Sequence, residues 1–188
     1  EGTLPVTDRA LGLRVTTDQE ASMGLVIKNA SQRALLGMFV NFKGEQWRRS
    51  GQLFPTQLSF SYRLCSASLD ENYSIHSDTG FISVPELNFV SPVYTSGGSG
   101  TDGNSPSHVQ NLTRNISFAE PLRPGQSVIL KWAYDRPSLS GHGLAIDDLV
   151  VSFFAESGPK NLTIEVLDGN SGNAVHLNWS ALVGTQYS

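Results

Sequence analysis

The chain has 188 residues, a formal net charge of −4 and only 16% charged residues. Its 13 Lys and Arg are spread along the sequence apart from Arg48-Arg49, which argues against nucleic acid or an anionic membrane surface as a partner, because both require clustered positive charge. No apolar run reaches 18 residues and no charged-then-apolar leader opens the chain, so we expect no membrane insertion and, for a secreted form, a leader already removed.

Taken in chain order, the sequence predicts strands and no helix. Clean alternation begins at Leu36 in a long strand that runs on to Arg49, and Leu58 to Leu64 has the best pattern of a half-buried strand. Between 95 and 108 the sequence is rich in Gly, Ser, Asp and Asn, which predicts a long loop. The predicted strands are 10–15, 22–28, 36–49, 58–64, 81–84, 87–90, 115–118, 127–134 and 143–154. With 18 glycines and 9 prolines available for turns, this pattern predicts an all-β fold.

The stretch 143–154 carries two adjacent carboxylates, Asp147 and Asp148, inside an apolar run. Side chains alternate along a strand, so both faces of this one are apolar, which predicts a strand covered on both sides. A buried carboxylate needs a cation or several donors, and we expect Arg48 or Arg49, or a structural Ca2+, to hold one of the two aspartates. A catalytic carboxylate pair is disfavoured, because neighbours in a strand point to opposite faces and cannot flank one bond.

The last part of the chain, 158–188, has a different character. Two short alternating segments, 162–166 and 175–179, are separated by a turn rich in Gly and Asn. With Pro159 before them and Trp179 at their end, they resemble the opening of a fibronectin type III module. We predict that 158–188 forms such opening strands, or an extension that pairs with the preceding domain or with a neighbouring chain.

Three segments stand out in order along the chain: Asp8-Arg9-Ala10-Leu11-Gly12, Gly44-Glu45-Gln46-Trp47-Arg48-Arg49 and Gly143-Leu144-Ala145-Ile146-Asp147-Asp148-Leu149, with Asp102-Gly103-Asn104 as a weaker fourth. Together they resemble a group of bacterial secreted β-sandwich modules found in large multidomain surface and exported proteins. The third segment is also similar to the late strand of MAM domains and of several carbohydrate-binding modules. The resemblance implies an antiparallel β-sandwich of jelly-roll type over 1–157, without the first strands that usually open such modules. An incomplete sandwich exposes edges that recruit further strands.

The candidate ligand-binding residues are Trp47, Arg48, Arg49 and Tyr94. An indole stacks on the apolar face of a sugar ring, and a guanidinium donates paired hydrogen bonds to hydroxyls or to an acidic group. The alternative, which we favour, is that Trp47 packs over an edge of the sandwich while one arginine neutralises Asp147 or Asp148. If Ca2+ is bound, Asp102 joins these two aspartates as a candidate ligand.

The remaining motifs argue against an enzyme. Cys65 is the single cysteine, which excludes an internal disulfide, and the four histidines lack zinc-ligand spacing. No Gly-x-Ser-x-Gly motif is present to raise a nucleophile. Six Asn-x-Ser/Thr triplets are candidate glycosylation sites, and they begin at Asn29, Asn72, Asn111, Asn115, Asn161 and Asn178.

These features favour a non-catalytic adhesion or carbohydrate-binding module of a larger secreted or cell-surface protein, with a polysaccharide or surface glycan as its partner. Two alternatives remain open. The chain could be a structural subunit of an extracellular fibre, assembled by strand exchange between neighbouring copies. It could instead be the accessory domain of a secreted hydrolase or nuclease.

Overall fold

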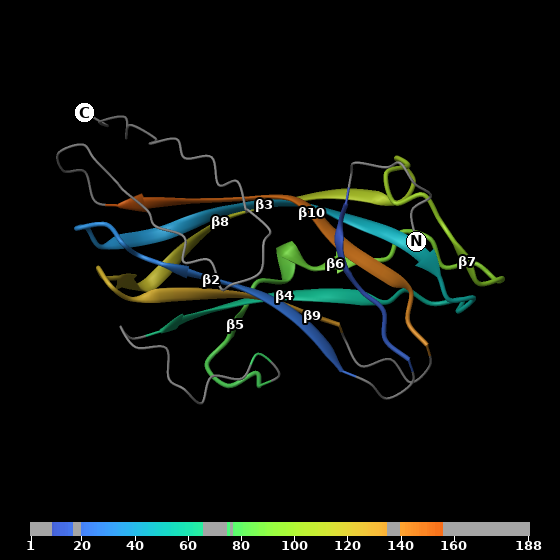
Figure 1. The fold of residues 1–188 in the computed structure, drawn as a ribbon, viewed down its shortest axis with the longest axis horizontal. Coiled ribbons are helices and arrows are strands. Elements are labelled where there is room, and N and C mark those ends of the chain that lie inside the picture. The colour runs from blue at the N-terminus through green and yellow to red at the C-terminus, as the bar shows by residue number, and fades with distance from the viewer. Residues whose placement is uncertain (1–8, 17–19, 66–74, 76, 135–139, 156–188) are drawn as a thin grey trace.

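The described part of the chain is a sandwich of two antiparallel β-sheets (Figure 1). The computed structural model describes residues 9–16, 20–65, 75, 77–134 and 140–155, so the predicted fibronectin-like segment 158–188 lies outside the described residues. Within these ranges the only helical element is one 3-10 turn, Pro85–Leu87. The predicted all-β fold is confirmed.

The first sheet has β3 and β10 at its centre. β3 spans Leu35–Arg49 and β10 spans Gly143–Ala155, and the two pair antiparallel over most of their length. β1 (Leu11–Leu13) pairs with the other side of β10. Along the other side of β3 lie β7 (Ser99–Gly100) and β8 (Val109–Leu122).

The second sheet has β9 and β4 at its centre. β9 spans Ser127–Tyr134 and β4 spans Gln57–Cys65. On one side β2 (Ala21–Lys28) pairs with β9 along its whole length, and on the other side β5 (Ile82–Ser83) and β6 (Phe89–Val90) both pair with β4.

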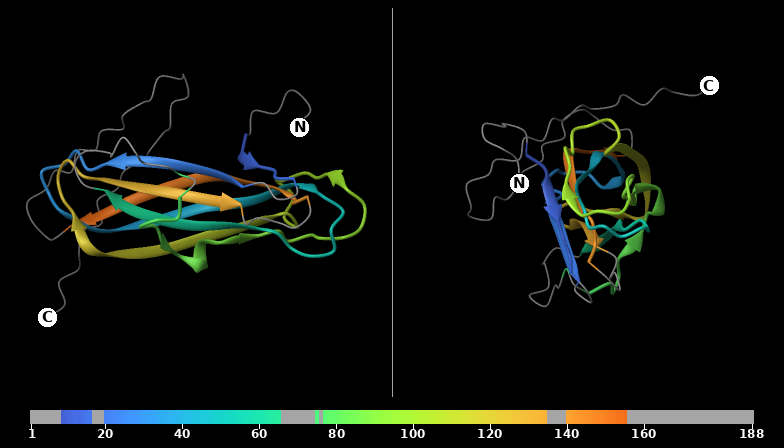
Figure 2. Two further views of the ribbon diagram at one scale, coloured as in Figure 1. Left: turned by 90° about the horizontal axis from the view of Figure 1, so that it is seen from below. Right: turned by 90° about the vertical axis from the view of Figure 1, so that its right-hand side faces the viewer.

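The chain crosses repeatedly between the two sheets. β1, β3, β8 and β10 belong to the first sheet, and the strands that follow the first three of these, β2, β4 and β9, belong to the second. This wrapping of antiparallel strands over two layers is the jelly-roll arrangement, which confirms the predicted type of sandwich. Figure 2 shows the elongated sandwich from its side and from one end.

The strand predictions differ most from the structure at β8. The sequence predicts a strand over 115–118 only, whereas β8 has 14 residues. Half of its side chains are polar and exposed, so the hydrophobic alternation that identifies a strand is present only at buried positions such as Leu112 and Ile116. Pairing with β3 along ten positions defines the strand instead.

The core lies between the layers and is built by inward-facing residues of both sheets. Phe42 of the first sheet meets Trp132 and Phe60 of the second, with ring centroids 5.6 Å and 6.3 Å away, and these rings are buried. The Phe42 and Trp132 rings meet edge to face, an arrangement that aromatic pairs prefer. Burial of Trp132 and Tyr62 confirms that both aromatics are core residues.

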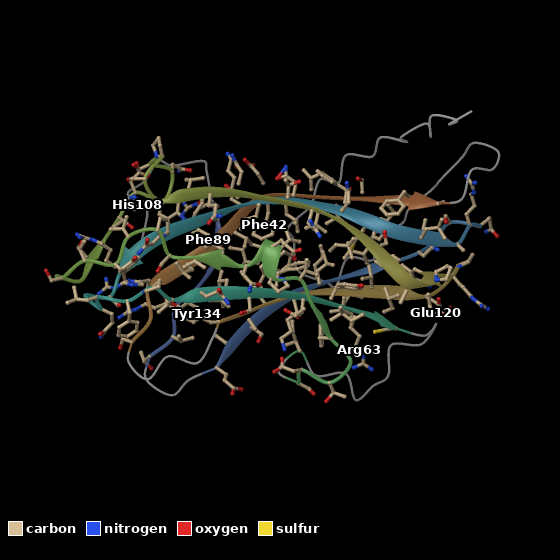
Figure 3. All side chains as sticks on the ribbon, turned by 180° about the vertical axis from the view of Figure 1, so that it is seen from behind. Phe42, Arg63, Phe89, His108, Glu120 and Tyr134 are labelled. Carbon is tan, nitrogen blue, oxygen red and sulfur yellow. The ribbon has the colours of Figure 1, made fainter. Side chains whose placement is uncertain are left out.

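Gly44 lies where the Phe89 ring of the opposite sheet packs against β3. A Cβ atom on Gly44 would lie 2.3 Å from ring atoms of Phe89, which comes from β6 in the opposite sheet. Figure 3 shows Phe42 and Phe89 between the two layers. The glycine therefore makes room for a buried ring in the core.

β10 is covered on both faces only in its first half. Residues 144–146 are buried, but Asp148 and Val150 are exposed. The prediction of a strand with two covered faces is therefore correct for the first half of β10 and wrong for the second.

A β-bulge causes this change. Asp147 pairs with Lys43 and Val150 with Asn41, so two residues of β10 lie opposite a single residue of β3. Asp148 has a φ of 49°, in the left-handed region that Asp tolerates better than most side chains. The extra residue reverses the alternation, so that the apolar side chains at 149, 151 and 153 face the core.

Asp148 is held by a lysine and not by an arginine. Its carboxylate lies 2.6 Å from the Lys43 ammonium on β3, and both side chains are exposed. This hydrogen bond and the carboxylate charge raise the pKa of Lys43 above its ordinary value. The expected pairing with Arg48 or Arg49 is wrong, because a bulge that points Asp148 to solvent brings it to the outward-facing Lys43.

Candidate ligand-binding site at the loop end

One end of the sandwich gathers the long connections of the chain, and we call it the loop end. It lies on the right in Figure 1, around β7. The described connections here are 50–56 between β3 and β4, 91–98 before β7, 101–108 before β8, and 140–142 before β10. Loops on a rigid scaffold are the usual place for binding residues.

His142 ties two of these connections together. Its ring is fully buried, Nδ1 accepts the backbone N–H of Ser50 at 3.0 Å, and Nε2 lies 3.2 Å from the carbonyl oxygen of Phe54. Because Nδ1 is an acceptor, the proton belongs on Nε2, which donates to Phe54. Burial lowers the pKa of His142, and the bond to the carbonyl opposes this shift only in part. The neutral imidazole therefore fixes the loop 50–56.

Tyr134 and Thr56 form a second set of buried hydrogen bonds beside His142. The Tyr134 hydroxyl donates to the carbonyl oxygen of His142 at 2.6 Å and accepts from the Thr56 hydroxyl at 2.7 Å. A Cβ atom on Gly141 would lie 2.4 Å from the Tyr134 oxygen, so only a glycine fits where the chain passes this ring. The base of the loop end is rigid as a result.

The segment 93–95 is fastened to β3 by two side chains. The Gln46 amide donates to the carbonyl oxygen of Val93 at 2.7 Å and accepts its backbone N–H at 2.9 Å. Arg49 donates from its two terminal nitrogens to the hydroxyls of Thr95 and Ser99, each at 2.7 Å. Tyr94 therefore stands on a segment that is held on both sides of it.

The loop end presents apolar side chains and arginines together, and we call this group the loop-end surface. Tyr94 is 44% exposed, and loop 50–56 adds two further exposed apolar residues. The backbones of these loops are in contact, because Ser91 donates its backbone N–H to the carbonyl of Thr56 at 2.8 Å. The loop-end surface consists of Arg48, Arg49, Leu53, Phe54 and Tyr94.

Sequence reasoning identified three of these five residues and missed Leu53 and Phe54. The structure brings Arg49 and Tyr94 together through Thr95, which is the neighbour of Tyr94 in the chain. Phe54 precedes a proline and is expected in a turn, so an apolar pair in a turn was the available signal. Which loops share one end of the fold is not visible in such a local pattern.

Trp47 is placed differently from the other predicted ligand residues. It is half-buried, its Nε1 donates to the buried Glu45 carboxylate at 2.9 Å, and its ring lies where a Cβ atom on Gly103 would be, 2.2 Å from that position. The connection 101–108 thus packs on the indole. This arrangement favours the packing interpretation of Trp47 over a sugar platform.

The three candidate calcium ligands do not form one site. Asp102 is exposed and its Oδ1 accepts the backbone N–H of Asn104 at 3.1 Å, whereas Asp147 accepts the backbone N–H of Asp148 at the bulge of β10. Among the described residues no group of three or more His, Cys, Asp or Glu is arranged to hold a metal ion.

Three of the six candidate glycosylation sites lie on described residues. Asn111 and Asn115 are exposed on β8. Asn29 is buried, and its Nδ2 donates to the carbonyl oxygens of Arg33 and Leu122 at 2.8 and 2.9 Å. A glycan on that nitrogen is incompatible with both bonds, so we carry forward only Asn111 and Asn115. The sites Asn72, Asn161 and Asn178 lie outside the described residues.

A shallow hollow of about 280 Å³ lies at the opposite end of the sandwich. It is lined by Leu64, Cys65, Glu120, Pro121, Arg123 and Gln126. Figure 3 shows Glu120 at this end and His108 at the loop end. Its lining does not combine exposed aromatic rings with paired cations, so we place the candidate site at the loop end.

The fold and the loop-end surface together define a β-sandwich of jelly-roll type with a candidate binding surface at one end. No family model matches the chain, and a search of curated proteins found no significant relative. Among the described residues there is no helix long and apolar enough to cross a membrane.

Proposed function

We propose that this chain is a non-catalytic carbohydrate-binding or adhesion module of a larger secreted or cell-surface protein, and that it contacts a glycan through the loop-end surface. The observation that carries the proposal is the Tyr94 ring, which is 44% exposed on a segment fastened by Gln46 and Arg49. An exposed aromatic on a fixed backbone can stack on a sugar ring with little loss of conformational entropy.

Two further features support this proposal. The loop-end surface combines apolar side chains with guanidinium groups, which matches the mixed apolar and hydroxylated faces of a saccharide. The exposed asparagines Asn111 and Asn115 stand in glycosylation triplets, as is compatible with passage through a secretory compartment.

The test is binding to a panel of immobilised neutral and acidic polysaccharides, compared between the wild-type chain and Tyr94→Ala. We expect the substitution to weaken binding at least about tenfold, the loss typical of one aromatic contact at the centre of an interface. Ile82→Ala is the matched control, because Ile82 is exposed to a similar extent, 47%, but lies on β5. Failure of the wild-type chain to bind any polysaccharide of the panel would refute the glycan proposal.

A fibre subunit is the second candidate function, and β1 favours it. Among the described strands, β1 pairs only with Leu144–Ile146 of β10, whereas β3 pairs with β10 as far as Ala155. The described strands therefore leave the backbone around Val150 open on that side, and its side chain is 41% exposed. An open apolar edge recruits strands from other chains.

Sedimentation of the full chain at micromolar concentration tests this candidate. Strand exchange predicts a concentration-dependent series of oligomers that Val150→Lys reduces, because a charge on an edge opposes pairing. Ile82→Lys adds the same charge elsewhere and should leave the series unchanged. A stable monomer removes the fibre candidate without affecting the glycan proposal.

A further inference from the structure

Two positive charges at the loop end have no acidic partner among the described residues. Neither Arg48 nor Arg49 takes part in the ion pairs found there, which use Lys43, Arg114 and Lys131. The terminal nitrogens of Arg49 bond instead to two neutral hydroxyls. These arginines are adjacent in a chain whose net charge is −4.

Both guanidinium groups are also partly removed from water. Each residue is half-buried, and the Nε atoms of Arg48 and Arg49 are buried without a hydrogen-bond partner in the described ranges. A charge in such a position interacts more strongly with an incoming anion than a charge in bulk water does. Its desolvation is costly until an anion arrives.

Two described acids at the loop end, Glu45 and Asp102, have other partners. Glu45 lies on the outward face of β3 beneath the indole, and its Oε2 receives the Trp47 N–H. Asp102 receives the backbone N–H of Asn104. Neither carboxylate therefore forms an ion pair with the two arginines.

Tyr94 lies on the segment that Arg49 fastens to β3. Gln46 and Arg48 point to one face of β3 and Arg49 to the other, since side chains alternate along a strand. Gln46 holds Val93 and Arg49 holds Thr95, so Tyr94 is the residue between the two contacts. A ligand stacked on Tyr94 therefore lies closer to Arg49, while Arg48 is on the opposite face of the same strand end.

From this juxtaposition we propose that the loop-end surface binds a negatively charged saccharide, one that carries a carboxylate or a sulfate ester on its ring. The inference rests on the proposed function and specifies its ligand class. Arg49 would receive the oxyanion, Arg48 would add positive charge from the other face of β3, and Tyr94 would stack on the ring that carries the oxyanion. A nucleic acid is a poorer fit, because two arginines make no stripe of positive charge along a phosphate backbone.

The experiment compares acidic polymers with their neutralised counterparts. The probes are polygalacturonate and its fully methyl-esterified form, and dextran sulfate and unsulfated dextran, each titrated into the full chain in a calorimeter. We expect esterification or the absence of sulfate to weaken binding at least about tenfold, the loss typical of a hydrogen-bonded charge. A preference for one acidic polymer identifies whether the anion is a carboxylate or a sulfate.

Arginine variants connect the effect to this site. Arg49→Gln should weaken binding to the acidic polymer about tenfold and Arg48→Gln should weaken it by less, while Arg123→Gln, at the opposite end of the sandwich, should leave it unchanged. Arg49→Lys keeps the charge but loses the paired hydrogen bonds of a guanidinium, so we expect an intermediate affinity. Thermal unfolding of each variant separates a lost contact from a lost fold.

The two proposals fail in distinguishable ways. If acidic and neutralised polymers bind equally and both glutamine variants match the wild type, while Tyr94→Ala still weakens binding, the acidic ligand class is wrong and the glycan proposal stands. Absence of binding to every polymer overturns both. Binding to acidic polymers that Arg123→Gln weakens as much as Arg49→Gln overturns the assignment to the loop end.

Discussion

Lys131 Nζ lies 2.6 Å from Asp78 Oδ1, although the lysine side chain is 2% exposed and the aspartate side chain 93% exposed. Lys131 is on the outer face of the second sheet, where the segment 77–81 crosses it. The ammonium also donates to the carbonyl oxygen of Ser77 at 3.3 Å and lies 4.9 Å from the centre of the Phe81 ring. The segment thus buries a charge while keeping its counter-ion in water.

Asp78→Asn should destabilise the fold through this buried ammonium. The ammonium would stay buried and lose its anion, so we expect the free energy of unfolding to fall by about 1–3 kcal/mol. Lys131→Met removes the charge itself and should be nearly neutral, since replacing a buried charge by an apolar chain of similar size often costs little. Urea denaturation of both variants measures the difference, and an Asp78→Asn protein as stable as the wild type would contradict this account.

Gly44→Ala should destabilise the core because its Cβ atom would meet the Phe89 ring at 2.3 Å. Overpacking of this kind costs about 1–3 kcal/mol. Gly100→Ala is the matched control, because a Cβ atom there has nothing within 4 Å and its stability should match the wild type.

A second substitution links the effect to the ring. Adding Phe89→Leu to Gly44→Ala should recover part of the loss, since residues in contact are energetically coupled. If the two substitutions destabilise additively in thermal unfolding, the contact is not the cause.

Strand positions were largely predictable from the sequence because alternation is a local property. The segment 127–134 has a large apolar residue at every second position from Val128 to Tyr134, and it forms β9 as predicted. The length of β8 was underestimated, because its exposed face carries polar residues of the kinds that are typical of loops. A local pattern does not show whether another segment covers the outer face of a sheet. Lys131 is at a position expected to face solvent, but the segment 77–81 buries it.

The candidate site was predictable in part for the same reason. Arg49 and Tyr94 were singled out by their chemistry, and the fold brings their neighbourhoods together through Thr95. Their companions Leu53 and Phe54 come from a loop that meets the segment 91–98 only in the folded chain. The role of His142 was also missed, because a histidine buried between two backbone groups has no sequence signature.

His142 should make stability fall as the pH drops below about 6.5, the ordinary pKa of a histidine side chain. Burial lowers its pKa in the folded chain below the ordinary value near 6.5, so the unfolded chain binds the proton more readily. Stability is therefore fully present above pH 6.5 and falls as the pH drops below that value towards the folded pKa. Urea denaturation at several pH values measures the slope.

Two histidine variants distinguish this source from other titrating groups. His142→Gln should flatten the slope in this window and lower stability at pH 7.5 by about 1–3 kcal/mol, because buried hydrogen-bond partners lose their contacts. His108→Gln changes a histidine of the connection 101–108 and should keep the wild-type slope. An unchanged slope in His142→Gln would show that another group is responsible.

Asp148 should tolerate some substitutions and also its own deletion. Asp148→Asn keeps a side chain that accepts the left-handed conformation and loses only an exposed ion pair with Lys43, so we expect little change. Asp148→Val places a branched side chain at a φ of 49° and should cost about 1–2 kcal/mol. Deleting Asp148 leaves one residue of β10 opposite one residue of β3, so the regular alternation from Ile146 onwards keeps the apolar side chains at 149, 151 and 153 on the core face. We expect this variant to be a folded monomer by circular dichroism and sedimentation, and an unfolded or aggregated protein would mean that the fold requires the bulge itself.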